Sequence, residues 1–253
     1  MKDIYLALAG AMGQEQRMAQ IANNLSNVNT VGFKKDGSVF LDYFKAAQAE
    51  AQAAGATSLP ENPSDHVWPT GARMFIDFAQ GDVRQTDRPL DAALAGDGFF
   101  RVQVEGDSRP FYTRAGNFQV NVDGDLVTPL GHAVLDDSGN PIRINTADSE
   151  PRINNDGERF VGETPAAKLG VARFEQPAVL IKYGKGLFTV PDGSQHEDVN
   201  DPDVRPGMIE GSNVRPIEEM IQMIQVQRAY ETQQKVMQTI DELFERRLNA
   251  ASQ

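Results

Sequence analysis

Residues 213–244 read NVRPIEEMIQMIQVQRAYETQQKVMQTIDELF, and apolar side chains recur in them at helical spacing. One series steps by three, four or seven residues, which is typical of a coiled-coil seam. Pro216 falls in the first turn, and Asn213 is placed to cap the helix. The pattern predicts a C-terminal helix roughly 50 Å long, which needs a partner. The apolar residues are Ile217, Met220, Ile221 and Ile224 in a first stripe, and Met223, Val226, Tyr230, Met237, Ile240 and Phe244 in the seam.

The first thirty residues supply a partner, because apolar residues there repeat every seven positions with others between them. Glu15 is the one charged residue on this seam, and the pattern predicts an amphipathic helix over about residues 3–28. Gly32 is a natural left-handed stop, and Lys34 and Lys35 are expected at the exit to solvent. The seam consists of Ile4, Leu8, Ala11, Met18, Ala22 and Leu25.

The C-terminal helix carries more apolar surface than one neighbouring helix can cover, because residues 217–224 and 223–244 form two overlapping stripes. A core helix of a helical domain is the simpler interpretation of either stripe. However, the two helices lie at opposite ends of the chain, and the residues between them differ in character. Exposed apolar strips of such length mark an interaction surface, so the pattern favours assembly.

Between the helices the pattern changes to short strands separated by turns. Residues 99–104 and 118–122 alternate, and Asp123-Gly124 is a hairpin-type turn. Residues 168–174 and 187–190 are also predicted strands. Residues 44–54 could form a short helix, with a loop at 55–69. We therefore predict an α+β protein with these parts: an N-terminal helix of a coiled-coil domain (1–35), a linker or extended segment (36–80), an inserted all-β barrel or sandwich (81–208), and the C-terminal helix of the coiled coil (209–253).

Composition excludes several classes of protein. A formal net charge of -12 over 253 residues argues against nucleic-acid binding, and the absence of cysteine excludes thiolate chemistry and disulfides. No run of eighteen apolar residues exists, so no direct membrane span is expected. The N-terminus has neither a basic region nor an adequate apolar core, so we expect no cleaved signal peptide.

The sequence offers no persuasive catalytic, cofactor or metal site. Residues 96–98 (GDG) precede a strand rather than a helix, which favours a tight turn over a nucleotide site. Asn121, Asp123 and Asp125 lack the spacing of a calcium loop. A carboxylate pair for hydrolysis stays open, as does a monomeric module whose β domain binds a ligand. The histidines are far apart in sequence, which disfavours a metal centre or a triad: His66, His132 and His196.

Three regions of the chain resemble the bacterial flagellar rod and hook protein family. Residues 21–34 (IANNLSNVNTVGFK) closely resemble its N-terminal signature, and residues 210–214 (EGSNV) resemble its C-terminal signature together with residues 218–221 and 225–231. Residues 89–91, 96–100, 112–118 and 124–127 are similar to its β-domain motifs. The length and the single modest β domain resemble the rod proteins rather than the longer hook proteins.

The resemblance implies a structural subunit, not an enzyme. Rod proteins of this family pack their terminal helices as an inner layer that lines the axial channel, and they transmit motor torque to the hook and filament. They reach the periplasmic rod through the flagellar type III export apparatus without a cleaved signal. The implied partners are further copies of the chain and neighbouring rod, hook and ring proteins.

The resemblance also implies which residues take part in assembly and which rod type is present. Residues 86–94 are most like the proximal rod type, whereas residues 221–231 are nearly as close to the distal type. Besides the apolar residues of the two helices, the implied assembly residues are Asn23, Asn24, Asn27, Val28, Gly32, Phe33, Ser212, Asn213, Val214 and Arg228.

Overall fold

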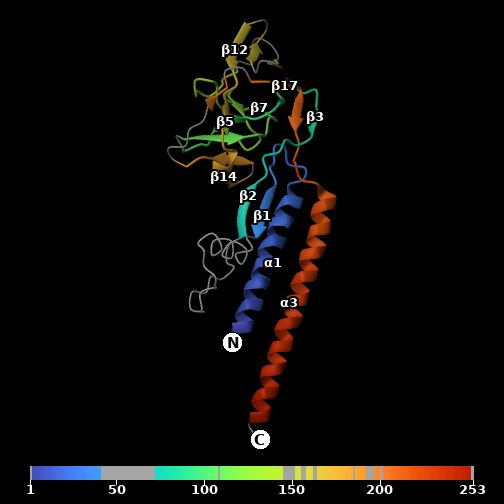
Figure 1. Cartoon of the computed structure of the whole chain (residues 1–253). Coiled ribbons are helices and arrows are strands. Elements are labelled where there is room, and N and C mark those ends of the chain that lie inside the picture. The colour runs from blue at the N-terminus through green and yellow to red at the C-terminus, as the bar shows by residue number, and fades with distance from the viewer. Residues whose placement is uncertain are drawn as a thin grey trace, which may run out of the picture. The chain divides into compact units, whose positions relative to one another are not determined.

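A computed structural model describes residues 2–40, 72–107, 109–144, 152–154, 158–161, 164–184, 186–191, 197–199 and 202–251. The chain divides into two units (Figure 1): residues 1–25, 36–76 and 215–253 form a helical unit, and residues 26–35 and 77–214 form a β unit. The combination of terminal helices in contact and antiparallel strands confirms the predicted α+β class. The helix considered for residues 44–54 and the loop at 55–69 lie outside the described residues.

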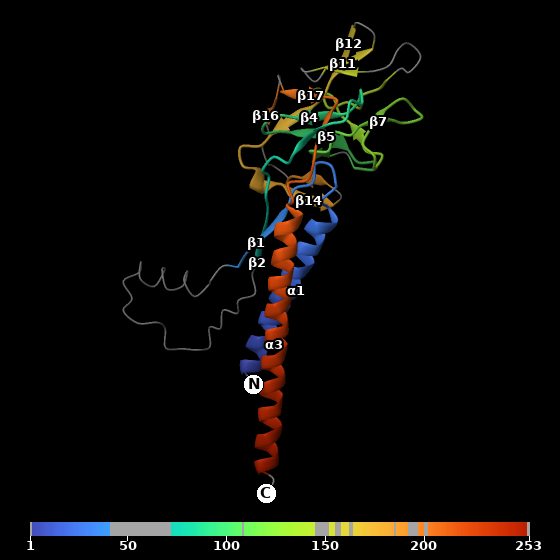
Figure 2. The same cartoon turned by 90° about the vertical axis from the view of Figure 1, so that its right-hand side faces the viewer.

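The helical unit is built on α1 (Lys2–Ser26) and α3 (Pro216–Ala251). They lie side by side and antiparallel in both views (Figures 1 and 2). Every residue of the α3 seam is buried or half-buried, and the spacing alternates between four and three residues, as a coiled-coil seam requires. The described seam residues are Glu219, Met223, Val226, Tyr230, Gln233, Met237 and Ile240.

A two-stranded ribbon completes the helical unit. β1 (Asp36–Phe40) pairs antiparallel with β2 (Ala72–Ile76), and Gly37 lies opposite Phe75. The Phe75 ring covers Gly37 so closely that a side chain there would collide with it. An aromatic ring packed on a cross-strand glycine stabilises a position that glycine alone would weaken.

The β unit contains a nine-stranded sheet whose strands are short and antiparallel. The predicted strands at residues 99–104 and 187–190 are found, and Gly124 has the positive φ of +83° that the predicted hairpin turn needs. The main path of the sheet runs β14 (Ile181–Gly184), β15 (Leu187–Thr189), β6 (Pro110–Thr113), β5 (Phe99–Gln103), β9 (Ala133–Val134), β8 (Leu126–Val127) and β7 (Gln119–Val120), and β13 (Val171–Arg173) joins β5 to β16 (Glu197–Asp198).

Smaller sheets flank this one within the same unit. They pair β10 (Arg152–Ile153), β11 (Glu158–Val161) and β12 (Thr164–Lys168), then β4 (Ala92–Leu94) with β17 (Val204–Pro206), and β3 (Val83–Gln85) with β18 (Met208–Glu210). A single 3-10 turn, η1 (Pro177–Val179), is the one helical element described in the β unit beyond the end of α1.

The predicted strand over residues 168–174 is divided into β12 and β13 at Gly170. Gly170 donates its N–H to the Leu135 carbonyl, and its own carbonyl accepts from Arg101. A side chain at Gly170 would collide with the Asp136 carbonyl, so only glycine fits where the chain crosses between sheets.

Two packed regions hold the β unit together. The apolar core includes Phe100, Val102, Phe111, Leu126 and Val134, all almost completely buried. A separate aromatic group joins Phe78, Phe99, Tyr112, Phe174 and Phe188, with ring centroids between 4.9 and 6.0 Å apart. Edge-to-face contacts of this kind add to the stabilisation from burial.

Candidate assembly surfaces

Gly10 on α1 contacts the side chain of Gln233 on α3. A Cβ atom built there would lie 2.7 Å from Nε2 of Gln233, so the missing side chain makes room for this glutamine. Gln233 is the polar interruption of the α3 seam, and its Oε1 is buried without a hydrogen-bond partner among the described residues. Gly10 and Gln233 therefore fix which turns of α1 and α3 face each other.

At the other end of the helix pair, a buried asparagine links three elements. Asn24 on α1 donates from Nδ2 to Oε2 of Glu219 on α3 (3.2 Å) and to the Asp36 carbonyl (2.9 Å). The Asp36 N–H donates back to Oδ1 of Asn24 (2.9 Å), and Gln20 donates to the same carbonyl (2.5 Å). The Asn24 amide thus pairs with the peptide group of Asp36 as a neighbouring strand would.

The side of α3 that faces away from α1 is apolar and exposed. Ile217, Ile221 and Ile224 are 69%, 52% and 53% exposed, and Arg228 continues this row at the same helical spacing. We call these four residues the outer stripe of α3. Met220 beside them is also exposed at 46%. A row of isoleucines this open is what an interaction surface requires.

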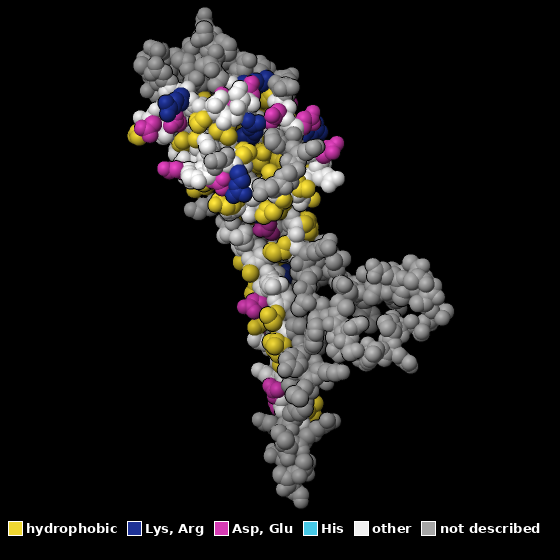
Figure 3. Space-filling model, turned by 90° about the vertical axis from the view of Figure 1, so that its left-hand side faces the viewer, with side chains coloured by type: hydrophobic (Ala, Val, Ile, Leu, Met, Phe, Trp, Pro, Cys, Tyr) yellow, Lys and Arg dark blue, Asp and Glu magenta, His cyan; other side chains and the backbone are white. Residues whose placement is uncertain are grey.

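α1 also has an outer stripe, which we define as Leu8, Met12, Glu15, Ala19 and Ala22; all five side chains are exposed. The sequence prediction that placed Leu8, Glu15 and Ala22 in the seam with α3 is therefore wrong, because Gly10 and Asn24, which contact α3, lie on the other side of α1. These residues recur every three or four positions and so share one side of the helix. Figure 3 shows apolar side chains following one another along the helical part of the molecule, with acidic side chains between them. Both helices therefore carry an apolar row outside their mutual seam.

The segment after α1 belongs to the β unit and is held there by Gly32 and Phe33. Gly32 has a φ of +67°, as expected for a left-handed stop, and donates its N–H to the Glu210 carbonyl (2.8 Å). A side chain at Gly32 would collide with the backbone of Arg114 and Ala115. Phe33 is buried, and Nζ of Lys182 lies 4.2 Å above the centre of its ring.

Lys34 is not at the exit to solvent, contrary to the sequence prediction. It forms a buried charge cluster with Glu210 and Arg114: Nζ of Lys34 lies 2.5 Å from Oε1 of Glu210, and Nη1 of Arg114 lies 3.3 Å from Oε2. Nζ also donates to the Ala79 carbonyl (2.8 Å), and the Gly81 N–H donates to Oε1 of Glu210 (2.9 Å). The partners stand far apart in sequence, so no local charge pattern indicates them.

Burial changes the acid–base behaviour of this cluster. Desolvation lowers the pKa of Lys34 although the Glu210 carboxylate opposes the shift, and desolvation likewise lowers the pKa of Arg114. Arg114 also donates to the Gly96 carbonyl (2.8 Å) and lies over the Phe99 ring. A buried cluster with so many partners fixes a geometry, and the loss of one member would leave the others unpaired.

Asn213 does not cap α3, because that helix begins at Pro216. Its Oδ1 accepts the Lys35 N–H (2.8 Å), and its Nδ2 donates to the carbonyls of Asp77 (2.8 Å) and Ala79 (3.1 Å). The Asn213 side chain therefore joins three segments of the β unit: its own, the one at Lys35 and the one at residues 77–79. Pro216 does stand at the first helical position, where its missing N–H costs nothing.

The remaining predicted assembly residues are spread over both units. Asn23 is exposed on α1, and Asn27 accepts the Thr30 hydroxyl hydrogen bond (3.1 Å). Ile4 and Phe244 lie in α1 and α3, with side chains outside the described set. Ala11 and Val214 are buried, and the half-buried members are Met18, Leu25, Val28, Ser212, Tyr230, Met237 and Ile240.

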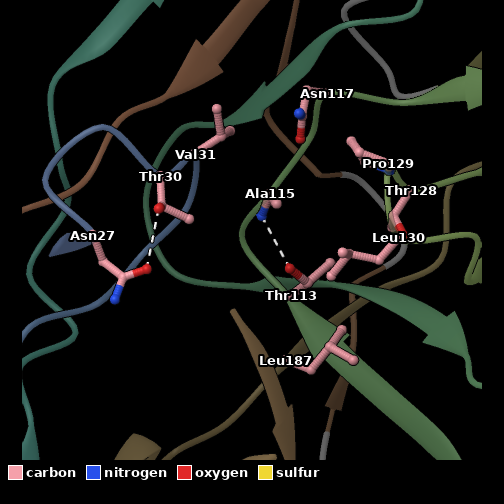
Figure 4. Close-up of a pocket in the computed structure, with 10 residues that line it drawn as sticks. All are labelled: Asn27, Thr30, Val31, Thr113, Ala115, Asn117, Thr128, Pro129, Leu130 and Leu187. Atoms are coloured by element: carbon pink, nitrogen blue, oxygen red, sulfur yellow. Dashed lines mark hydrogen bonds between the residues drawn. The ribbon is translucent and has the colours of Figure 1, made fainter. Parts of the chain in front are cut away.

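The β unit has a surface pocket of about 310 Å³ (Figure 4). Asn27, Thr30 and Val31 line it on one side, and Leu130 and Leu187 contribute apolar surface. Its lining contains no titratable side chain, so it lacks the carboxylate pair that hydrolysis would need. The described residues contain no cluster of potential metal ligands, and none of the described helices is long and apolar enough to cross a bilayer.

The chain matches three family descriptions in chain order. Residues 4–34 match "Flagella basal body rod protein", residues 93–160 match "Flagellar hook protein FlgE/F/G D1 domain", and residues 205–250 match "Flagellar basal body rod FlgEFG protein C-terminal". The first and third matches contain most of α1 and most of α3, and the second covers much of the described β unit.

Whole-length relatives agree with these matches. The flagellar basal-body rod protein FlgF of Caulobacter vibrioides is 32% identical over 95% of this chain and 94% of its own length. FlgG of Bacillus subtilis is 32% identical over 98% of both chains, and FlgF of Mesorhizobium japonicum is 29% identical over 92% of this chain and 91% of its own. The chain belongs to the flagellar basal-body rod protein family and is a structural subunit of the rod, not an enzyme.

Proposed function

We propose that this rod subunit self-assembles helically through α1 and α3, lines the export channel and transmits torque to the hook and filament. The outer stripe of α3 is the observation that carries the proposal, because three exposed isoleucines on one side of a helix are unfavourable in water. Two stripes on opposite sides of a helix pair give a head-to-tail contact, which repeats without closing unless the rotation happens to close.

The partners and location that we propose follow from family membership. We infer that the chain contacts further copies of itself and neighbouring rod, hook and ring proteins in the periplasmic part of the basal body. We propose export through the flagellar type III apparatus on the same ground. We also propose a role in assembly for the predicted residues outside the stripes, among them Asn27 and Ser212.

We also propose the proximal rod type over the distal type, on the sequence of residues 86–94. This segment forms a tight charged turn: Thr86 donates to Oδ2 of Asp91 (2.6 Å), Arg88 makes a bidentate pair with Asp91, and Asp87 has a φ of +59°. A tagged chain should label the membrane-proximal end of the rod in isolated basal bodies. Label confined to the hook-proximal end would support the distal type instead.

Aspartate substitutions test the assembly proposal. We expect Ile221→Asp or Ile224→Asp to abolish incorporation into basal bodies and swimming. An unpaired charge buried in a dry helix interface destabilises that interface by about 3–5 kcal/mol. Leu25→Asp should act similarly. Gln227→Asp is the matched control, since Gln227 is exposed on α3 outside the outer stripe. Normal swimming with Ile221→Asp, or equal defects with Gln227→Asp, would contradict the proposal.

A further inference from the structure

The helix pair has its two outer stripes on opposite sides, so one copy can offer α1 to one neighbour and α3 to another. We propose that the outer stripe of α1 packs antiparallel against the outer stripe of α3 of a second copy of this chain, with Glu15 of one copy paired with Arg228 of the next. This inference rests on the proposed self-assembly through the terminal helices, and it adds the partner surface and its register.

The register comes from the contacts inside one copy. Asn24 lies level with Glu219, and Gly10, fourteen residues earlier, lies level with Gln233, fourteen residues later. Each step back along α1 therefore matches one step forward along α3. By the same rule Glu15 lies level with Arg228 along the helix axis.

The side chains of the two outer stripes complement each other in size at this register. Ala19 is level with Ile224, and Ala22 is level with Ile221, so small residues of one stripe lie opposite large residues of the other. A copy placed alongside without an axial shift brings these residues together. Alanines opposite isoleucines let the helices approach closely and cover the isoleucines. Further along, Leu8 is level with Lys235, whose aliphatic stem can cover it.

The charges of the stripes are also complementary. Glu15 is the one charged residue among the five of the α1 stripe, and Arg228 is the one among the four of the α3 stripe; both are exposed. Within the described part of the chain, neither forms a salt bridge. A charge in an apolar helix seam destabilises it unless a partner lies opposite, and such a pair then selects register and partner. Because the same chain carries both halves, a second copy supplies the partner.

Disulfide trapping can test the contact, since the chain has no cysteine of its own. Full-length Ala22→Cys and Ile221→Cys copies with tags of different mass are mixed and oxidised. We expect the mixed dimer to exceed either homodimer, because only the mixed pair joins the two stripes. Ala22→Cys mixed with Gln227→Cys is the control and should yield much less. Equal yields with Gln227→Cys, or a predominance of homodimers, would overturn the proposal.

Charge reversal then tests the ion pair between copies. Adding Glu15→Arg to the Ala22→Cys copy should lower the yield of mixed dimer at least about tenfold, because two arginines then face each other. Adding Arg228→Glu to the Ile221→Cys copy should restore it. Recovery between separate chains cannot come from contacts within one copy. An unchanged yield with Glu15→Arg would reject the pairing.

Cells distinguish a failure of this register from a failure of the proposed function. Cells with Glu15→Arg that swim normally, while cells with Ile221→Asp do not, would reject the Glu15–Arg228 pair and leave assembly through the helices standing. If both variants swim normally, assembly through these stripes fails as well. If Glu15→Arg and Arg228→Glu each abolish swimming and their co-expression restores it, the register is supported.

Discussion

The buried charge cluster of the β unit and the outer stripe of α3 place side chains where each type is least favoured. Lys34, Arg114 and Glu210 are charged and buried, but each carries ion-pair or hydrogen-bond partners within the same unit. Ile217 and Ile221 are apolar and exposed, and nothing in the described part of the chain covers them. Charges satisfied internally hold one chain in shape, whereas apolar surface left uncovered has to be covered from outside.

Glu210→Ala should disrupt the buried charge cluster and cause the largest loss of unfolding free energy among these variants. It would leave two buried cations and the Gly81 N–H without their acceptor, at a cost of about 3–5 kcal/mol. Urea unfolding followed by circular dichroism, at concentrations where the chain is monomeric, measures this loss. The exposed Glu218→Ala serves as control and should change the unfolding free energy by under about 0.5 kcal/mol.

Gly32→Ala should cause the second-largest loss of unfolding free energy. The left-handed backbone costs a side chain about 1–2 kcal/mol, and the collision with the backbone of Arg114 and Ala115 adds to that cost. Gly96 separates the two contributions, because it also has a positive φ, of +84°, but a Cβ added there would meet no atom within 4 Å. Gly96→Ala should therefore cost less than Gly32→Ala in the same unfolding assay; equal losses would show that backbone conformation alone decides.

The features that can be predicted from the sequence are those that depend on the local spacing of apolar residues. Spacing alone locates α1 to within two residues at each end, and it indicates α3 and the short strands, because each element's own residues carry its pattern. It also predicts that α3 has two apolar stripes, and the structure places one in the seam and leaves the other exposed. The spacing also identifies the stripe that forms the seam, but the turns of α1 and α3 that face each other depend on contacts such as the one between Gly10 and Gln233, which no local pattern encodes.

The features missed depend on residues that meet across the fold. Lys34 looks like a solvent-facing exit residue because it is a charged residue just after the predicted helix stop, while its partner Glu210 stands 176 positions away. Asn213 looks like a helix cap because it is an asparagine just before the helical pattern, yet it bonds Lys35 and Asp77. A glycine inside a predicted strand was the one usable signal, since Gly170 marks the break between β12 and β13.

Asn24→Leu should show that the helical unit also contains an internally satisfied site. Leucine keeps the approximate volume but removes the hydrogen bonds to Glu219 and to both backbone groups of Asp36, for a loss of about 2 kcal/mol. Gln16→Leu is the control, since that side chain is exposed on the same helix. Hydrogen exchange at the Asp36 amide should rise sharply for Asn24→Leu and stay nearly unchanged for Gln16→Leu.

Ile224→Gln should have the smallest effect on the stability of the single chain, which would distinguish the exposed outer stripe of α3 from the buried sites. Glutamine is a better helix former than isoleucine, and the site is 53% exposed, so the unfolding free energy of the monomer should change by less than about 0.5 kcal/mol. Assembly should nevertheless weaken, because the methyl groups lost are those that a neighbouring helix would cover. Urea unfolding and pelleting of assembled protein measure the two quantities separately. If monomer stability fell by about 2 kcal/mol, as for a core residue, the outer stripe would belong to the fold of one chain rather than to a contact between chains.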